Sequence, residues 1–445
     1  MSFDIDRIYQ KKNQVTPYRE EGLVLETKGM VFKVSLKTAS LGSRVKFKNE
    51  DGQTNYGEVV GLSSESCLVM PYQDLGSINS RTKVYCENFN NDVFVCNELL
   101  GRVIDAFGNP LDGKGPIHSF HGKYQGLTGE HINPLSRPPI TDSLSFGVRS
   151  IDSFVTIGKG QRMAILAGSG VGKSVLLGMM AKNSSAQVNV IALVGERGRE
   201  VREFIENDLG PEGLARSVVI VATSDTGPLT RMRAAYCATS ISEYFRDQNQ
   251  DVLLLMDSVT RFAMAAREIS LSAGDPPGQK GYTPSVFARL PKLLERAGRV
   301  DGKGSITGIY TVLVEGGDMD EPITDAVRAI SDGHIQLSRA LAAKNHFPAV
   351  DVLSSISRVM NKVVSREHRI VSGHLRDLLA AYQDSEDLIN VGAYSKGTNP
   401  RVDKAIKIYD ELINFLRQSQ DDEVKADMEV MFDQLIELAR KAEQN

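Results

Sequence analysis

The sequence predicts an α/β protein in which a doubly wound core lies between a β-rich N-terminal part and a helical C-terminal part. Three observations lead to this. Residues 162–182 have the order strand, glycine loop and helix. After them, continuous apolar runs alternate with helix-like stretches, as in a parallel sheet covered on both faces. From about residue 372, strand signals end and the apolar residues follow helical spacing.

The composition is typical of a globular protein with more than one domain. At 445 residues the chain is too long for one ordinary core, so about two to four domains are expected. No apolar run approaches ~18 residues, which predicts no transmembrane helix. The N-terminus lacks the apolar centre of a signal peptide, so we expect a cytoplasmic protein. A net charge of −4 argues against broad nucleic-acid binding.

The cysteines are predicted to be free thiols. They show neither C-x-x-C spacing nor a nearby histidine pattern, which a zinc site would need. A reducing compartment would keep them unpaired. They are Cys67, Cys86, Cys96 and Cys237.

The N-terminal part is predicted to hold an exposed arm and a small β domain. In the arm, residues 1–21, Ile5, Ile8 and Tyr9 form one apolar face of a helical turn, which suits either a partner-binding helix or a frayed terminus. In residues 22–97, short β-rich runs separated by polar turns predict a barrel or a sandwich, and a barrel would remove the free strand edges. The runs are residues 23–25, 30–34, 57–61, 67–70 and 93–95.

Two stretches lead into the core. In residues 101–113, GRVIDAFGNPLDG, the Gly-Asn-Pro at 108–110 predicts a turn between two apolar segments. Residues 133–140, NPLSRPPI, contain three prolines and are predicted to be an irregular connector.

The core domain is predicted to span residues 98–371, and a helical domain residues 372–445. Alternating strands and helices give a doubly wound sheet, with ligands at the carboxyl ends of the strands. The expected strands are residues 188–194, 218–222, 252–256 and 309–314, and the expected helices are residues 199–208, 229–246, 261–269 and 285–297.

The glycine loop is predicted to bind the phosphates of a nucleotide. Its glycines let backbone N–H groups close around a phosphate chain at the positive end of the following helix. Lys173 then reaches the β- and γ-phosphates, and the Ser174 hydroxyl ligates Mg²⁺. Ala167 replaces the first glycine of the usual pattern, but it is small and the later glycines remain. The nucleotide-binding residues expected are Gly168, Ser169, Gly170, Val171, Gly172, Lys173, Ser174 and Val175.

Charged residues that follow two other strands are predicted to carry the chemistry. Asp257 ends the run DVLLLMD and would orient the Mg²⁺; the alternative is a helix N-cap, because Ser258 follows. Glu196 and Arg197 follow the strand at 188–194. Phosphoanhydride hydrolysis needs a group that polarises water and a positive charge on the γ-phosphate, and these two residues suit those tasks. Taken alone, they are also an ordinary ion pair.

These motifs resemble the rotary-type ATPases, most closely the flagellum-specific type III export ATPases. The resemblance is carried by residues 101–113, by AGSGVGKS at 167–174, by GERGRE at 195–200 and, above all, by residues 257–298. It implies a β-barrel, a RecA-like nucleotide domain and a C-terminal helical domain. It also implies a homohexameric ring with ATP and Mg²⁺ bound between neighbours.

The resemblance assigns further roles. Arg358, in SSISRVM, is similar to the arginine finger that one subunit donates to its neighbour's nucleotide. Phe347, in HFPAVD, matches an aromatic residue that stacks on adenine, although core packing is an alternative; a second adenine-stacking aromatic has no match. The loop at 275–282 would face the central channel, where a stalk protein sits. By the same resemblance, Glu196 activates water, Lys173 and Arg197 bind the γ-phosphate, and Ser174 and Asp257 serve Mg²⁺.

The leading hypothesis is an ATPase of flagellar type III export, peripheral at the cytoplasmic side of the inner membrane. Its expected partners are the export stator, stalk and export-gate proteins and chaperone–substrate complexes, with no nucleic acid. The closest rival is the ATPase of a virulence-type secretion system. A rotary ion-pump catalytic subunit fits less well because its loop usually reads GGAGVGKT. A Rho-like RNA translocase conflicts with the acidic charge, and a purely structural ring subunit conflicts with the intact Glu196.

Overall fold

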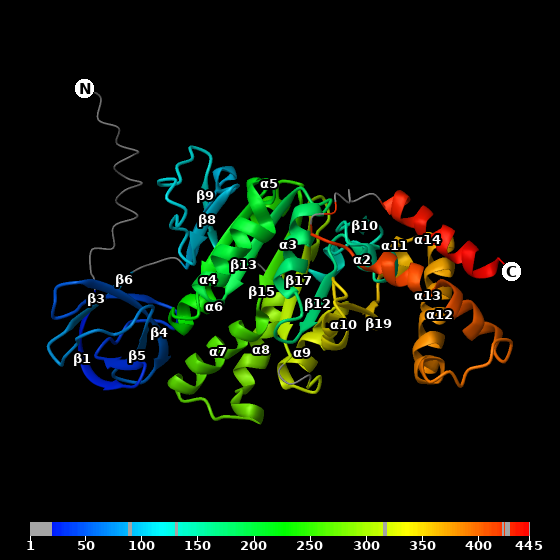
Figure 1. The fold of residues 1–445 in the computed structure, drawn as a ribbon. Helices are drawn as coiled ribbons and strands as arrows, with labels where there is room; N and C mark the ends of the chain where they lie inside the picture. The colour runs from blue at the N-terminus through cyan, green and yellow to red at the C-terminus, as the bar shows by residue number, and fades with distance from the viewer. Residues whose placement is uncertain are drawn as a thin grey trace, which may run out of the picture.

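The computed structural model describes residues 20–87, 91–129, 132–314, 318–420, 422 and 428–444. Figure 1 shows three parts in a row: a barrel in blue, an α/β core from cyan to yellow, and a helical part in orange and red. The predicted fold class is therefore confirmed. Residues 1–19, most of the predicted arm, lie outside the described residues, and Glu21 already begins the first strand.

The N-terminal strands form a closed barrel rather than a sandwich, in the order β1-β2-β5-β4-β3-β6. Phe32 and Phe47 pack edge to face inside it, with ring centroids 5.1 Å apart. Strands β3 and β6 were not predicted, because polar and apolar residues alternate in them and leave no continuous apolar run. The strands are β1 Glu21–Lys28, β2 Val31–Val34, β3 Arg44–Lys48, β4 Thr54–Leu62, β5 Cys67–Pro71 and β6 Lys83–Glu87.

The segment after the barrel differs from the prediction at one strand. The run at 93–95 was grouped with the barrel strands, but β7 (Asp92–Val95) pairs with β9 (Lys123–Gly126) in a separate two-stranded ribbon. Between them, η1 (Asn97–Leu99) leads to β8 (Arg102–Asp105), which joins the core sheet beside β14 (Ser217–Ala222). The turn predicted at 108–110 is present: the Asp105 carboxylate accepts hydrogen bonds from the backbone N–H groups of Phe107 and Asn109, each at 2.8 Å.

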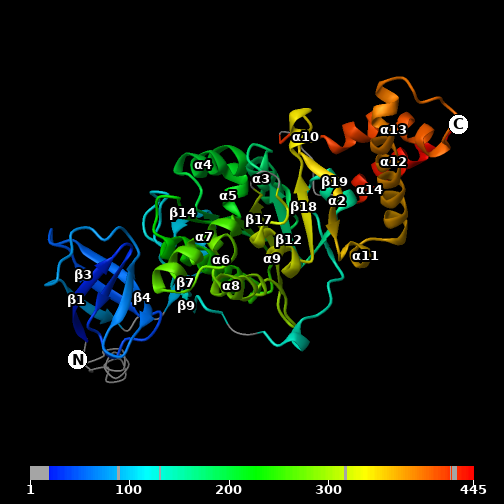
Figure 2. The same ribbon diagram turned by 90° about the horizontal axis from the view of Figure 1, so that it is seen from below.

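Within the described residues, nine strands form the core sheet, in the order β19-β18-β12-β17-β15-β13-β14-β8 with β16 beside β17. The strands from β18 to β8 are parallel, whereas β19 and β16 run antiparallel to their neighbours. Figure 2 shows this sheet extending from β14, on the barrel side, to β19, beside the C-terminal helices. The remaining core strands are β12 Arg162–Ala167, β13 Val188–Val194, β15 Asp251–Asp257, β16 Gly298–Arg299, β17 Ser305–Leu313, β18 Gly333–Leu337 and β19 Val350–Ser357.

Helices cover both faces of the sheet. One core cluster joins the sheet to α6, α7, α8 and α9, and a second joins its other face to α2, α3 and the C-terminal helices. Their bounds are α2 Arg149–Phe154, α3 Lys173–Asn183, α4 Gly198–Glu203, η3 (a π-helical turn) Phe204–Leu209, α5 Gly210–Ala215, α6 Pro228–Arg246, α7 Val259–Ala273, α8 Pro284–Leu294, α9 Pro322–Ile330, α10 Arg339–Ala343 and α11 Met360–Val363.

The stretch at 133–140, predicted to be an irregular connector, and the stretch at 275–282, predicted to be a loop, are mostly irregular, but each contains one short 3₁₀ turn. These turns are η2 (Pro134–Ser136) and η4 (Gln279–Gly281). A small two-stranded antiparallel sheet of β10 (Ser143–Leu144) and β11 (Ile157–Gly158) follows the first stretch, and α2 lies between its two strands in sequence.

The C-terminal part consists of α12 (Arg366–Asn390), α13 (Pro400–Leu416) and α14 (Met428–Glu443). Helix α12 begins before the predicted onset at 372, where the Ser365 side chain accepts a hydrogen bond from the His368 backbone N–H. None of the helices in the described ranges has both the length and the apolar composition needed to span a membrane.

Candidate active site

The glycine loop lies between β12 and α3, at the carboxyl edge of the sheet. Gly172 caps α3 in the left-handed conformation, with φ of +80°. A Cβ at Gly172 would lie 3.2 Å from the Phe347 ring, and one at Gly168 would lie 2.7 Å from Nε of Arg339. Both glycines therefore permit close contacts that a side chain would block. Of the other loop residues, Val171 is buried, whereas Ser169, Gly170, Ser174 and Val175 are exposed.

Lys173 contacts both the carboxylate predicted to activate water, Glu196, and the one predicted to serve Mg²⁺, Asp257. Its Nζ lies 2.5 Å from Oδ1 of Asp257 and 3.2 Å from Oε1 of Glu196. Asp257 is the last residue of β15 and Glu196 lies two residues after β13, and these strands are adjacent and parallel with Leu193 opposite Asp257. Because parallel strands end at one edge of a sheet, three residues far apart in sequence meet beside the glycine loop.

The raised pKa of Glu196 in this cluster suits it to accept a proton. Burial raises the pKa of Glu196 to about 7, and the Asp257 charge adds to this effect, while Lys173 opposes it. Burial lowers the pKa of Lys173, but the charges of Asp257 and Glu196 more than offset burial, so its pKa is raised and it stays protonated. A carboxyl group that titrates near neutral pH can accept a proton from water under working conditions.

Asp257 is not a helix N-cap. The cap of α7 is Ser258, whose side chain accepts a hydrogen bond from the Arg261 backbone N–H. The Asp257 carboxylate instead accepts a 2.6 Å hydrogen bond from the Thr311 hydroxyl on β17. Sequence reasoning missed Thr311; its signal was a polar residue inside the apolar run of a buried strand.

Sequence reasoning also missed Arg261. Its side chain packs on Gly195, directly before Glu196. Its Nη1 faces the Met264 sulfur at 3.7 Å. The only sequence signal was its place four residues after Asp257.

The structure brings Phe347 to the loop but not the two predicted arginines. Phe347 is 40% exposed and lies beside Gly172. The Arg197 side chain is 81% exposed and its Nη1 donates to Oε1 of Glu200 at 3.1 Å, away from Lys173. Arg358 follows the edge strand β19 and donates to the Ser331 carbonyl oxygen at 3.2 Å.

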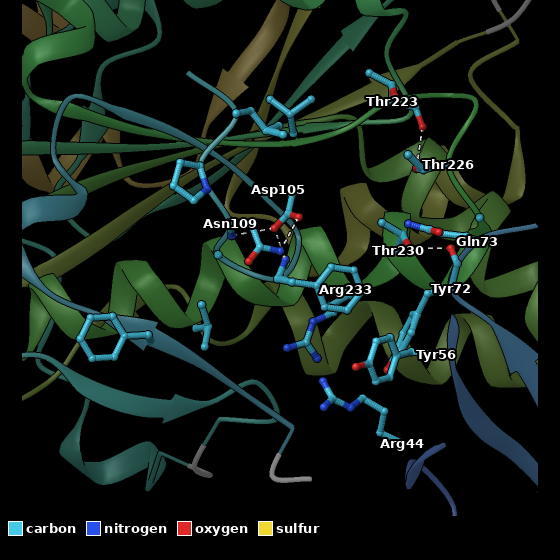
Figure 3. A pocket seen from close by; sticks show the side chains of 18 of the residues that line it. Arg44, Tyr56, Tyr72, Gln73, Asp105, Asn109, Thr223, Thr226, Thr230 and Arg233 are labelled. Carbon is cyan, nitrogen blue, oxygen red and sulfur yellow. Dashed lines mark hydrogen bonds between the residues drawn. The ribbon is translucent and has the colours of Figure 1, made fainter. Parts of the chain in front are cut away.

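A cavity of about 1120 Å³ lies between the barrel and the core, and Figure 3 shows part of its lining. It includes no residue of the glycine loop. Its polar groups largely bind one another: the Thr230 hydroxyl donates to the Tyr72 carbonyl oxygen at 2.9 Å, and Arg233 donates to the carbonyl oxygens of Ala106 and Asp92. We therefore regard the cavity as part of the interface between two domains and place the candidate active site at Lys173.

Comparison with known proteins gives a consistent picture. The family described as "ATP synthase alpha/beta family, nucleotide-binding domain" matches residues 147–357, and "T3SS EscN ATPase C-terminal domain" matches residues 364–437. The chain is 52% identical to the flagellum-specific ATP synthase of Bacillus subtilis, covering 91% of this chain and 92% of that protein. It is 47% identical to the type 3 secretion system ATPase of Xanthomonas euvesicatoria, covering 91% of each chain.

A solved structure is similar over nearly the whole chain. It is that of the assembled ATPase EscN from the type III secretion system of enteropathogenic E. coli, with 42% identity and a TM-score of 0.88. The match covers 94% of this chain and 100% of that one. A second structure shows EscN in complex with its central stalk EscO, with 42% identity and a TM-score of 0.86, over 94% of this chain and 100% of that one.

Proposed function

Because the chain belongs to the ATP synthase alpha/beta family, in the branch of the flagellum-specific and type III secretion ATPases, we propose that it energises flagellar protein export as a homohexamer. The chain is an ATP-hydrolysing enzyme of type III protein export. The flagellar branch is supported by 52% identity to the Bacillus subtilis protein, against 47% to the Xanthomonas secretion ATPase. The latter makes a virulence-type system the second candidate.

The observation that carries the chemistry is the cluster of Lys173, Glu196 and Asp257. The loop N–H groups and Lys173 bind the phosphates, and Glu196, with a pKa of about 7, takes the proton of the attacking water. The Ser174 hydroxyl and the Asp257 carboxylate are the hard oxygen donors that suit Mg²⁺. When bound, Mg²⁺ neutralises charge on the phosphates.

The ring accounts for Arg358. This exposed arginine makes no hydrogen bond or ion pair with the Lys173 cluster in the described part of its own chain. We assign it to the nucleotide of a neighbouring subunit. The assembled structure of EscN supports a ring, and the EscN–EscO complex supports a stalk protein, which the loop at 275–282 would contact.

Mixed rings test the subunit interface. Arg358→Ala should lower turnover by about 10³-fold or more yet spare nucleotide binding. Mixing it with Glu196→Gln protein should restore part of the activity, because some interfaces then join an intact Glu196 to an intact Arg358. Full turnover of Arg358→Ala alone would refute the assignment. Glu196→Gln alone, expected to be inactive, is the control.

The partners and the location can be tested by purification from native cells. We propose a cytoplasmic protein, peripheral at the inner membrane, that binds export stator, stalk and export-gate proteins and chaperone–substrate complexes. Co-purification of flagellar export proteins would support this. Needle-complex proteins would favour the virulence-type system, and RNA that stimulates hydrolysis would favour a translocase.

A further inference from the structure

Arg197 points away from the position its proposed role requires. It lies directly before α4, with its Nη1 3.1 Å from Oε1 of Glu200 in the same chain. This ion pair is exposed, with 81% of the Arg197 side chain and 41% of the Glu200 side chain accessible. Exposed pairs of this kind are weak and exchange readily. A cation that approached Glu200 from elsewhere would free Arg197.

Glu200 lies next to the catalytic carboxylate. Burial and the Asp257 charge raise the pKa of Glu196 most, and a hydrogen bond with the Glu200 side chain raises it further. Glu200 therefore acts on the Glu196 carboxyl and pairs with Arg197, so any cation that binds Glu200 must approach the place where the γ-phosphate is proposed to lie.

A cation for which the described residues offer no partner lies near the proposed arginine finger. Arg328, in the last turn of α9, is half-buried, and its buried Nε has no hydrogen-bond partner in the part of the chain that the structure describes. Within the described residues, its guanidinium makes no hydrogen bond or ion pair. The nearby Asp332 is engaged by Arg162, at 3.1 Å from Nε. A buried donor left unpaired destabilises the fold, so Arg328 suits a partner from outside its own chain.

Arg328 and Arg358 share one corner of the molecule. Arg358 donates to the carbonyl oxygen of Ser331, which directly follows α9, the helix that carries Arg328. Burial lowers the pKa of His334, and the charges of Arg328 and Arg358 both lower it further, so both guanidinium groups act on the same imidazole. A surface that brings Arg358 to a neighbour's γ-phosphate therefore brings Arg328 close to the residues around that phosphate.

We infer that Arg328 of one subunit binds Glu200 of the next and thereby releases Arg197 toward the γ-phosphate. The inference rests on the proposed function, which places Arg358 at the same interface. In this exchange Arg328 replaces Arg197 as the partner of Glu200, and Arg197 moves to the γ-phosphate. Each arginine therefore faces one negative group. Arg328 is then a positioning residue, and hydrolysis in one subunit requires the neighbour to be in place.

Combining substitutions of Arg328 and Glu200 and comparing kcat tests the exchange. Arg328→Gln should lower kcat by about 10- to 100-fold, the usual cost of a misplaced catalytic group. Glu200→Gln frees Arg197 without any exchange, so adding Arg328→Gln to Glu200→Gln should cause no further loss. The matched control is Arg199→Gln, which removes an exposed ion pair with Glu203 on the same helix and should leave kcat unchanged. If the double variant instead lost activity by the product of the two single losses, the inference would be overturned.

Mixing variant proteins shows whether Arg328→Gln folds. It also distinguishes a failure of this inference from a failure of the proposed function. Arg328→Gln protein mixed with Glu196→Gln protein should regain activity, which also shows that the variant folds. Arg328→Gln protein mixed with Arg358→Ala protein should not regain activity. Arg328 and Arg358 act from the same face of a subunit, so every interface then lacks one of them. Wild-type kcat in Arg328→Gln, or no rescue by Glu196→Gln, would overturn the exchange alone. Wild-type turnover in Arg358→Ala would instead overturn the proposed interface.

Discussion

The pH dependence of hydrolysis should report the ionisation of Glu196. Burial, the Asp257 charge and a hydrogen bond with Glu200 raise its pKa to about 7, although Lys173 opposes them. The water-activating form is the carboxylate, so activity should rise with pH. The ionised fraction of Glu196 is about 1/11 one unit below the pKa and about 10/11 one unit above it, so kcat/KM should rise roughly tenfold from about pH 6 to about pH 8.

The assay is the initial rate of phosphate release at low Mg-ATP, where kcat/KM reports groups of the free enzyme. Glu200→Gln provides the comparison, because it removes a group that raises the pKa of Glu196 and should move the midpoint to lower pH. Ionisation of the substrate is the same for both proteins, so a difference between their midpoints belongs to the enzyme. A flat wild-type profile, or equal midpoints, would refute the reasoning.

Three substitutions test the packing and the metal site. Gly178→Ala places a Cβ 2.6 Å from the Cβ of Asp208, so overpacking should lower the free energy of unfolding by about 1–3 kcal/mol; thermal unfolding at an unchanged temperature would contradict this. Arg296→Met leaves the buried carboxylate of Glu243 without its 2.7 Å partner and should cost about 3–5 kcal/mol in urea unfolding, where wild-type stability would contradict it. Thr311→Val removes the hydroxyl 2.6 Å from the carboxylate that ends β15, and should raise the Mg²⁺ concentration for half-maximal activity about 10- to 100-fold; an unchanged requirement would argue against metal binding there.

Strands buried on both faces were the part of the fold that the sequence predicted best. The run at 188–194 coincides with β13, because every residue of that strand is buried and all of them except Asn189 are apolar. Strand β18, GHIQL, joins the same sheet but alternates buried and half-buried residues, so its signal was weaker. Similarly, β7 looked like one more barrel strand, because a short apolar run does not specify which strand it pairs with.

The site, too, contains residues that the sequence predicted and residues that it did not. Lys173, Glu196 and Asp257 were predictable because each lies at the end of a strongly patterned element or within two residues of it, and parallel topology then places them together. Thr311 could be noticed as a polar residue in a buried strand, but its role could not be predicted, since that role depends on the neighbouring strand in the sheet order. The outward position of Arg197 depends on a contact one helical turn along α4, for which a motif has no signal.

The ion pairs of Lys173 show what nucleotide binding must accomplish. Its ammonium group contacts Asp257 at 2.5 Å and Glu196 at 3.2 Å, yet these residues are proposed to serve phosphate, metal and water separately. Binding of Mg-ATP must therefore exchange partners: Lys173 passes to a phosphate, and the carboxylates become available for metal and water. Each new contact replaces an ion pair of similar charge, so the exchange needs little net change in burial of charge. The proposed exchange of Arg197 on Glu200 extends the same principle to the subunit interface, where the replacing cation comes from the neighbour.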